Sequence, residues 1–565
     1  MNRNLNLGFS IAVFLLGTGA RQYLAAKLVL AQSRAGSATV QGIGTEVERR
    51  VDQVFAVYDN SDSPGCALGV IQNGDFVYRK AYGMGSLELG VPLSPQSVFY
   101  MGSVAKQFTA ASIVLAAEQD FLSLDDDVRK YIPELPDYGQ PVTLRQMLHH
   151  TSGLPDALSM FGISGRSLED LHTTGEAMNL IAHQKALNFN PGEQYLYSNT
   201  NYFLLGQVLN RATKKPLPEF AAENIFKPLG MTHTLFYDDH TLVVPGRVAA
   251  YSPGKDGHFL VNWATTYDFI GAGGLMTNVN DLLLWDRNFY NNRLGRGTLL
   301  KEMQTRAVLN NGKESNYALG LMMTAYRGLP VVEHGGANFG YRADILRFPR
   351  QRFTVMTLCN ISTADPNALT RKVADIYLEK ELLPPPVLGA PSDLNPTLFA
   401  GKYFDSQTHY MASFTIQQGQ LLLEGHVLQA IAPNEFEDPI LGGTVAFSGT
   451  RGEMTATVTY NNAITFAGTR INDLHLDDAA LAAYVGTYSS AELDATYKLS
   501  VENGSLMLLV NWNSAVKLQP IIQNEFDAGG RTIVFRRDNT NHVSGLSVFS
   551  GWDGAIRNEW FEKLN

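Results

Sequence analysis

Ser103 and Lys106 stand three residues apart in the segment Tyr-Met-Gly-Ser-Val-Ala-Lys that begins at Tyr100. An apolar run follows Ser103, so we expect a helix to begin there and to place Lys106 one turn further on the same face. A serine hydroxyl needs an adjacent base to act as a nucleophile, and a lysine can be that base when burial favours its neutral form. N–H groups at the start of the helix would stabilise charge on an attacked carbonyl. The pair is therefore suited to forming an acyl-enzyme.

Two further motifs carry groups that this chemistry requires. Tyr197-Ser198-Asn199 combines a phenol that can pass a proton to a leaving group with an amide that can bind a substrate. His334-Gly335-Gly336-Ala337-Asn338 has glycines that let the backbone approach a ligand closely. Taken singly, the first two motifs have structural alternatives: a capping serine with a solvated lysine, and a polar loop with core tyrosines.

The order and spacing of the three motifs resemble the serine β-lactamase and penicillin-binding protein superfamily, especially its class C-like branch. Ser-x-x-Lys is followed roughly 90 residues later by Tyr-x-Asn, and roughly 135 residues after that by the glycine motif. The resemblance spans about residues 45 to 380. Three other segments also look similar to that family: residues 122–126, 148–154 and 271–275.

The resemblance implies a role for each matching residue. Ser103 would be acylated, Lys106 would accept its proton, and Tyr197 would relay protons to the leaving group. Asn199 would hold the substrate. The backbone N–H groups of Ser103 and Ala337 would form the oxyanion hole, a feature often worth about 3 kcal/mol per donor.

The third motif departs from the Lys-Thr-Gly of β-lactamases, because His334 stands where the lysine is usual. A full positive charge for a substrate carboxylate is thereby lost, while Gly335, Gly336 and Ala337 would still line the substrate. A His-x-Gly motif resembles D-aminopeptidases and related peptidases, in which two antiparallel barrels follow the catalytic domain. A barrel loop can restrict the active site in such proteins, but no residue in this sequence identifies that loop.

Residues 45–383 are expected to form an α/β (α+β) catalytic domain of the β-lactamase/transpeptidase type, an antiparallel sheet beside a helical subdomain. Apolar runs around turn residues predict hairpins at Gly65–Tyr78 and Ala343–Leu358. Apolar periodicity predicts helices between them, at 105–119, 144–149 and 201–211. The proline-rich segment 384–394 is expected to be a stiff linker.

The remaining sequence contains an internal repeat. Phe399-Ala400-Gly401-Lys402-Tyr403 matches Tyr484-Val485-Gly486-Thr487-Tyr488 at an offset of 85 residues, and Asn434-Glu435-Phe436 matches Asn524-Glu525-Phe526 at an offset of 90. Short alternating strands predict two small antiparallel, lipocalin-like β-barrels at residues 395–478 and 479–565.

The N-terminal residues 1–31 are typical of a signal peptide, cut after Ala20 or Ala31, which predicts a periplasmic or secreted protein without a stable membrane anchor. A net charge of −10 with scattered basic residues disfavours nucleic acid as a partner. Cys66 and Cys359 lie in apolar runs, so separate buried thiols are favoured, with a single disulfide as the alternative.

Other polar clusters have simpler interpretations. His149 and His150 have no suitably spaced acid and are expected to be structural, and Asp125-Asp126-Asp127 should cap a turn. The sequence has no His-Glu-x-x-His motif and no acidic calcium loop, so neither a metal nor another cofactor is predicted.

The best-supported function is a serine peptidase or amidase that acts on small peptides, including peptides with D-residues or peptides derived from bacterial cyclic or cell-wall material. Carboxylesterase and D-alanyl-D-alanine carboxypeptidase activities are alternatives on the same scaffold. An inactive, penicillin-binding-like ligand-binding protein is the alternative from another class. The partner is thus a small peptide, amide or ester, and the sequence is silent on oligomeric state.

Overall fold

The structure is a computed structural model that describes residues 45–167, 170–262, 269–384, 395–438, 443–450, 452–460, 463–511, 513–550 and 555–564. The chain forms two compact units, residues 1–53 and 54–565, and helix α2 (Glu46–Phe55) crosses their boundary. All of the features below belong to the second unit. The predicted signal peptide and all but the first residue of the predicted linker lie outside the described residues.

A six-stranded antiparallel sheet joins the two ends of the catalytic region in the order β10-β11-β12-β13-β1-β2. Both predicted hairpins are confirmed, and Asn73 (φ 55°) with Gly74 (φ 86°) provides the left-handed turn that the first requires. The strands are β1 (Cys66–Gln72), β2 (Asp75–Tyr82), β10 (Met322–Tyr326), β11 (Leu329–Asn338), β12 (Tyr341–Phe348) and β13 (Phe353–Cys359).

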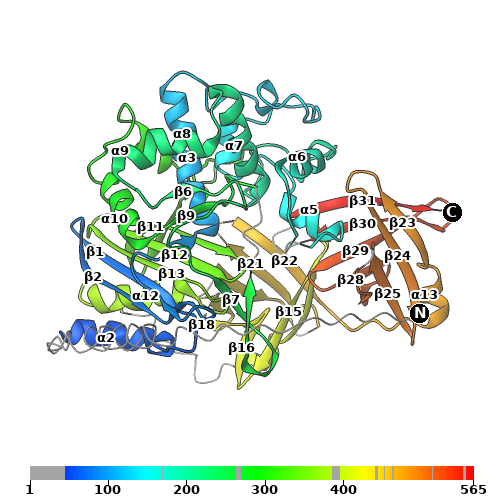
Figure 1. The fold of residues 1–565 in the computed structure, drawn as a ribbon. Helices are drawn as coiled ribbons and strands as arrows, with labels where there is room; N and C mark the ends of the chain where they lie inside the picture. Colours follow the sequence, from blue (N-terminus) through cyan, green and yellow to red (C-terminus); the bar gives the residue numbers. More distant parts are fainter. Residues whose placement is uncertain are drawn as a thin grey trace, which may run out of the picture. The chain divides into compact units, whose positions relative to one another are not determined.

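Helices cover both faces of this sheet (Figure 1). Helix α3 (Ala105–Glu118) is the centre of the helical side, and every residue from Ala105 to Ala116 is buried. A helix that is buried on all sides needs neighbours all around it, and α7, α8 and α11 pack against α3. The opposite face carries α12 (Pro366–Tyr377), which packs on β12 and β13. The other helices include α4 (Leu144–Leu148), α5 (Ala157–Ile163), α6 (Thr174–Ala182), α7 (Asn199–Thr213), α8 (Leu217–Ala221), α9 (Lys227–Leu229), α10 (Val279–Asn288) and α11 (Leu299–Met303).

Smaller sheets connect the helical side to the main sheet. One has the order β5-β9-β6, and the other two are the pairs β3-β4 and β7-β8. Their strands are β3 (Met84–Ser86), β4 (Val91–Pro92), β5 (Phe99–Tyr100), β6 (Leu235–Phe236), β7 (Ala250–Pro253), β8 (Phe259–Asn262) and β9 (Leu275–Thr277). Strand β5 leads directly into the segment that carries Ser103.

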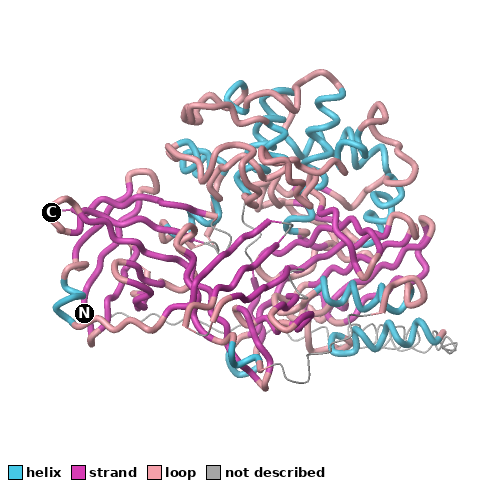
Figure 2. Tube along the Cα trace, turned by 180° about the vertical axis from the view of Figure 1, so that it is seen from behind, coloured by secondary structure: helices cyan, strands magenta, loops and turns pink. Residues whose placement is uncertain are grey.

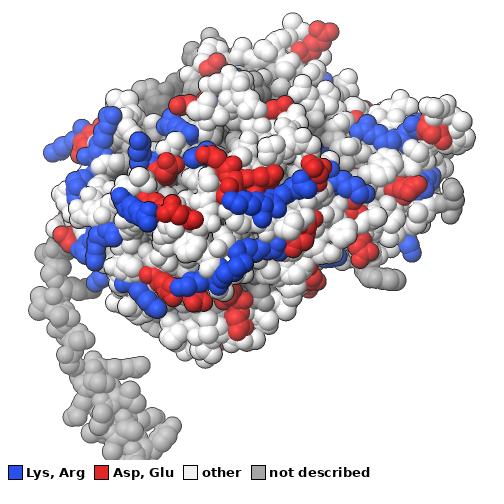
Figure 3. Space-filling view, turned by 90° about the horizontal axis from the view of Figure 1, so that it is seen from above, with Lys and Arg blue, Asp and Glu red and all other residues white. Residues whose placement is uncertain are grey.

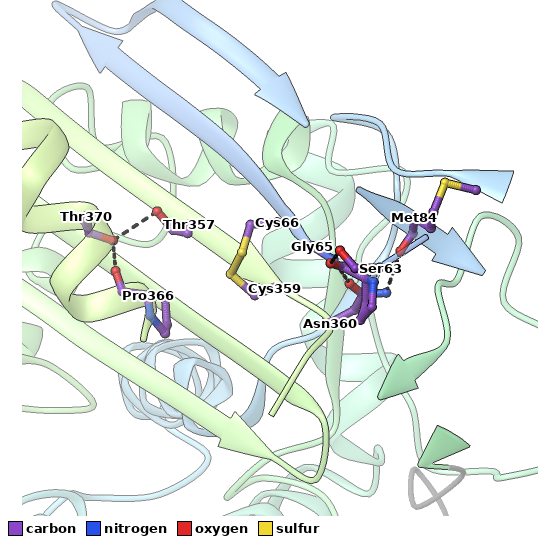
Figure 4. The surroundings of a disulfide bond; sticks show 10 residues. Ser63, Gly65, Cys66, Met84, Thr357, Cys359, Asn360, Pro366 and Thr370 are labelled. Atoms are coloured by element: carbon purple, nitrogen blue, oxygen red, sulfur yellow. Dashed lines mark hydrogen bonds between the residues drawn. A yellow bond between two sulfur atoms is a disulfide. The ribbon is translucent and has the colours of Figure 1, made fainter. Parts of the chain in front are cut away.

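Cys66 and Cys359 form a disulfide between directly opposed positions of β1 and β13 (Figure 4). The expectation of buried strand cysteines holds, but the expectation that they are separate thiols is wrong. Their separation of 293 residues hid the pairing, because β1 and β13 become neighbours only in the folded sheet. Beside the disulfide, Asn360 accepts a hydrogen bond from the Gly65 N–H and donates to the Met84 carbonyl, so the end of β13 is also tied to the residue before β1 and to β3.

Two nine-stranded antiparallel sheets follow, each nearly closed into a barrel, which confirms the predicted repeat (Figure 2). Their strand orders are equivalent, and in each the two edge strands are consecutive in the chain. Barrel 1 contains β14 (Gly401–Asp405), β15 (Tyr410–Gln417), β16 (Gln420–Leu423), β17 (His426–Val427), β18 (Gln429–Ala432), β19 (Glu435–Asp438), β20 (Gly443–Ser448), β21 (Thr455–Tyr460) and β22 (Ala463–Ile471). Barrel 2 contains β23 (Gly486–Ser490), β24 (Ala495–Glu502), β25 (Ser505–Val510), β26 (Val516–Lys517), β27 (Gln519–Ile522), β28 (Glu525–Asp527), β29 (Arg531–Arg537), β30 (Val543–Ser550) and β31 (Ile556–Leu564).

Charged side chains of both signs alternate over the surface above the helical side (Figure 3). The ion pairs of the catalytic region include Arg211 with Glu134 and Arg145 with Asp125. Exposed pairs of this kind contribute roughly 0 to 1 kcal/mol each, so the stability of the fold rests on its apolar core. Among the described helices, none is long and apolar enough to cross a membrane.

Removing the disulfide should destabilise the catalytic domain. Cys66→Ser together with Cys359→Ser frees a loop of 293 residues in the unfolded chain, and we expect a loss of about 2 to 4 kcal/mol, measured as a lower unfolding midpoint in calorimetry. Reductant should lower the midpoint of the wild type and leave the double variant unchanged. Two free thiols in the unfolded, unreduced wild type would contradict the bond.

Candidate active site

Ser103 lies in a short 3-10 turn, η2 (Gly102–Val104), that leads into α3. This turn is pressed against β11, and two glycines make the approach possible. A Cβ on Gly102 (φ 51°) would lie 2.6 Å from the Ala337 nitrogen, and one on Gly336 would lie 2.0 Å from the Met101 oxygen. Both distances are shorter than real Cβ contacts, so side chains at these positions would push the strand away from Ser103.

Lys106 is fully buried, and its Nζ lies 3.0 Å from Ser103 Oγ. The same Nζ lies 2.9 Å from Asn199 Oδ1 and 2.7 Å from the Ala272 carbonyl oxygen. Those two oxygens only accept, so a neutral amine gives its two hydrogens to them and turns its lone pair toward the serine hydroxyl. Burial lowers the pKa of Lys106 to about 7, against an opposing effect of the Asp156 carboxylate. The amine can therefore take the serine proton near neutral pH.

Tyr197 lies beside both Ser103 and Lys106. Its phenol is hydrogen-bonded to Ser103, and the Lys106 Nζ is 4.7 Å from the centre of its ring. Burial raises the pKa of Tyr197, so the phenol keeps its proton at neutral pH. A protonated phenol beside the serine oxygen can hand a proton to a group that leaves from that point.

Asn199 is the first residue of α7, and protein groups engage both ends of its amide. Its Oδ1 accepts from Lys106, and its Nδ2 donates to Asp156 Oδ2 over 3.0 Å. The Asp156 carboxylate also accepts from the Asn199 backbone N–H over 2.6 Å, which fixes the orientation of the amide. Sequence reasoning missed Asp156, although it follows the family-like segment 148–154 by two residues.

His334 is buried under the third motif, where burial and the nearby charge of Lys106 lower its pKa to about 4. The imidazole is therefore neutral at pH 7. Its Nδ1 lies 2.7 Å from the Gly335 carbonyl oxygen, which only accepts, so Nδ1 carries the hydrogen. Its Nε2 then accepts from the Tyr317 hydroxyl over 3.0 Å. Both nitrogens are occupied within the protein, and Tyr317 is a second residue that sequence reasoning missed.

The C-terminal end of β11 has one backbone edge that lies beside Ser103. Glu333 is the last β11 residue paired with β10, while Gly335 and Ala337 are exposed beyond it. A Cβ on Gly336 would lie 3.1 Å from the Ser103 nitrogen, so the backbone segments that carry the Ser103 and Ala337 N–H groups lie against each other. Two N–H donors beside a serine oxygen have the composition of an oxyanion hole.

His150 packs beneath this cluster as a buried support. Its ring centre lies 4.3 Å from that of Tyr197, and its Nδ1 accepts from the Ser198 backbone N–H over 3.1 Å. Burial lowers its pKa well below the ordinary value, and burial lowers the pKa of His149 to about 4. Both histidines are thus neutral at pH 7, and their structural role stays a prediction.

A cavity of about 1570 Å³ opens over Ser103 and is walled by three parts of the chain. The catalytic domain contributes Tyr197, His334 and Ala337, barrel 1 contributes Tyr460 at the end of β21, and barrel 2 contributes Arg557 in β31. No pattern in the sequence marked these barrel residues, since their position depends on how the barrels dock.

This fold and this site define an active-site serine hydrolase of the β-lactamase and transpeptidase type. A family model described as Beta-lactamase matches residues 47–378, and the chain belongs to that family. The D-aminopeptidase of Brucella anthropi is 24% identical over 86% of this chain and 94% of its own length, and that of Gluconobacter oxydans is 28% identical over 61% and 64%.

Solved structures share the fold. The octameric penicillin-binding protein homologue of Pyrococcus abyssi covers 83% of this chain and 99% of its own, with a TM-score of 0.54 and 20% identity. The D-amino acid amidase of Ochrobactrum anthropi SV3 complexed with L-phenylalanine amide covers 60% of this chain and 99% of its own, with a TM-score of 0.50 and 20% identity.

The pKa of Lys106 predicts the pH dependence of Ser103 reactivity. Since the base must be neutral, the rate of phosphonylation of Ser103 by a fluorophosphonate should rise through about pH 7 and fall about tenfold per unit below it. Intact-protein mass spectrometry over time measures this rate. Lys106→Arg stays charged and should abolish the rise, and a rate independent of pH between 5 and 8 would contradict the assignment.

Proposed function

We propose that this chain is an exported serine peptidase or amidase that cleaves small peptides and amides, including those with D-residues. The observation that carries the proposal is the neutral His334, whose two nitrogens are both occupied by Gly335 and Tyr317. A site with no cation at this position favours substrates whose scissile bond is not followed by a free carboxylate. The names of the relatives, D-aminopeptidases and a D-amino acid amidase, support the same class of substrate.

The proposed reaction assigns one step to each group. Lys106 Nζ takes the proton from Ser103 Oγ as that oxygen bonds to the substrate carbonyl carbon. The negative carbonyl oxygen is held by the N–H groups of Ser103 and Ala337. Tyr197 gives its proton to the leaving amine as the carbon–nitrogen bond breaks, and Lys106 returns a proton to the phenol. A water molecule then attacks the acyl-enzyme through the same groups in reverse and releases the acid.

The alternatives differ in what they ask of the site. A carboxylesterase needs the same nucleophile and an easier leaving group, so it remains the second candidate. A D-alanyl-D-alanine carboxypeptidase needs a partner for the terminal carboxylate, which a neutral His334 does not offer. A binding protein without turnover needs no base, whereas Lys106 is held with its lone pair toward Ser103.

A panel of substrates tests the proposal. We expect hydrolysis of D-amino acid amides and D-aminoacyl p-nitroanilides with kcat/KM at least tenfold above that for the L-forms, and little or no acylation by a labelled penicillin. Ser103→Ala should be inactive on all of them. Cleavage of p-nitrophenyl esters alone would favour the esterase, and labelling by penicillin with cleavage of peptides ending in D-alanyl-D-alanine would favour the carboxypeptidase.

Export is proposed from two features. The N-terminal apolar segment is typical of a signal peptide, and a buried disulfide suits an oxidising compartment. Expression of the full chain in a bacterial host should yield a periplasmic or secreted protein whose N-terminus, read by mass spectrometry, is Arg21 or Gln32. Uncleaved protein confined to the cytoplasm would contradict this proposal.

A further inference from the structure

Helix α5 lies between the active site and barrel 2, and it contacts barrel 2 at both of its ends. Asp156 is the N-cap of this helix, and its Oδ1 accepts from the Ser159 N–H over 2.9 Å. The other carboxylate oxygen holds Asn199, which in turn holds Lys106. The carboxylate that orients the catalytic lysine is therefore a part of the same turn that starts α5.

At the N-terminal end of α5, barrel 2 binds the backbone of Asp156. The Asp156 N–H donates to the Ala555 carbonyl over 3.3 Å, just before β31 begins. Asn188 reinforces this contact, because its Nδ2 donates to the same carbonyl over 3.0 Å and its Oδ1 accepts from the Arg557 N–H over 2.9 Å.

At the other end, three side chains of barrel 2 bind the carbonyl groups of the last residue of α5 and of the two residues that follow it. Such carbonyls have no partner within a helix. The Tyr497 hydroxyl donates to the Ile163 carbonyl over 2.6 Å, and Asn511 Nδ2 donates to the Ser164 carbonyl over 2.7 Å. Asn513 Nδ2 donates to the Gly165 carbonyl over 2.8 Å.

The internal repeat shows that these contacts are particular to barrel 2. At the 85-residue offset, barrel 1 has Ala412 where barrel 2 has Tyr497. The offset changes from 85 to 90 between β25 and β26, so barrel 2 carries five extra residues, Asn511 to Ala515. The extra segment contains both of the capping asparagines. Because barrel 1 has the same fold without them, the barrel fold does not account for Tyr497, Asn511 and Asn513. A function at the contact with α5 accounts for all three residues.

We propose that barrel 2 is a positioning element of the active site, which holds helix α5 at both ends and so fixes the Asp156 carboxylate against Asn199 and Lys106. A helix of seven residues is too short to be stable by itself, so its position depends on what holds its ends. Small displacements of a group that orients a catalytic residue can cost up to about 100-fold in rate. Tyr497, Asn511 and Asn513 are thus positioning residues, although none of them reaches the substrate cavity.

The test compares three variants of the full chain: a double variant, a matched control and Asp156→Asn. Tyr497→Phe with Asn511→Asp removes two of the caps: phenylalanine keeps the ring stacking on Phe561, and aspartate keeps an acceptor for the Thr496 N–H. Tyr488→Phe is the matched control, because it removes a buried hydroxyl of barrel 2 that donates to Tyr484 within the barrel. The readout is the pH profile of Ser103 phosphonylation, with unfolding midpoints measured on the same samples.

We expect the double variant to react about tenfold more slowly at its plateau. The midpoint of its pH profile should also move to lower pH. The reason is that Lys106 would lose part of the interaction with the Asp156 charge, which raises the pKa of the lysine against the effect of burial. Asp156→Asn should move the midpoint in the same direction, and Tyr488→Phe should change neither quantity. The proposal is overturned if the double variant has the same phosphonylation rate and pH profile as the control. It is also overturned if the plateau rate falls while the midpoint of the pH profile stays where it is in the wild type. Phosphonylation does not depend on which amide is the substrate, so this result stands apart from the substrate panel.

Discussion

The burial of one amine organises the catalytic domain. Lys106 has to be dry enough to lose its proton near pH 7 and yet close enough to Ser103 to use its lone pair. An unpaired amine in such a place would be costly, and the cost is offset by two fixed acceptors, Asn199 Oδ1 and the Ala272 carbonyl. Helix α3 is rich in apolar residues and is enclosed by α7, α8 and α11, and this enclosure is what keeps Lys106 dry.

The second constraint is the close approach of β11 to the turn that carries Ser103. Gly102 and Gly336 have no side chains to hold the two segments apart, so the backbone of Ala337 lies against the turn that carries Ser103. The position of β11 depends on β12 and β13, and β13 is tied covalently to β1. The disulfide has no part in the chemistry, but it belongs to the sheet that positions β11. His334 lies in the same strand and is kept neutral by its burial. At this position β11 therefore offers a substrate backbone groups and no positive charge.

The two barrels share a fold and differ in how they meet the catalytic domain. Barrel 1 contributes Tyr460 to the wall of the substrate cavity, whereas barrel 2 contributes Arg557 to that wall and also contacts the C-terminal end of α5. Duplication supplies two copies with the same core, in which Tyr403 and Tyr488 even repeat the same internal hydrogen bond. Outside that core, each copy is free to change where it touches its neighbour, and the five-residue insertion of barrel 2 is such a change.

The sequence by itself determined the local and repeated features: the hairpin at Asn73-Gly74, helix α3 behind Ser103, the spacing of the three motifs and the two barrels. These features depend on residues that are neighbours in the sequence or on the internal repeat, and both can be recognised in one sequence. The tertiary structure alone decided the Cys66–Cys359 pair, the contact of Asp156 with Asn199 and the bond of Tyr317 to His334. It also decided which barrel residues reach the site. Those contacts join segments 17 to 293 residues apart, and their chemistry depends on burial and register, which no local pattern records.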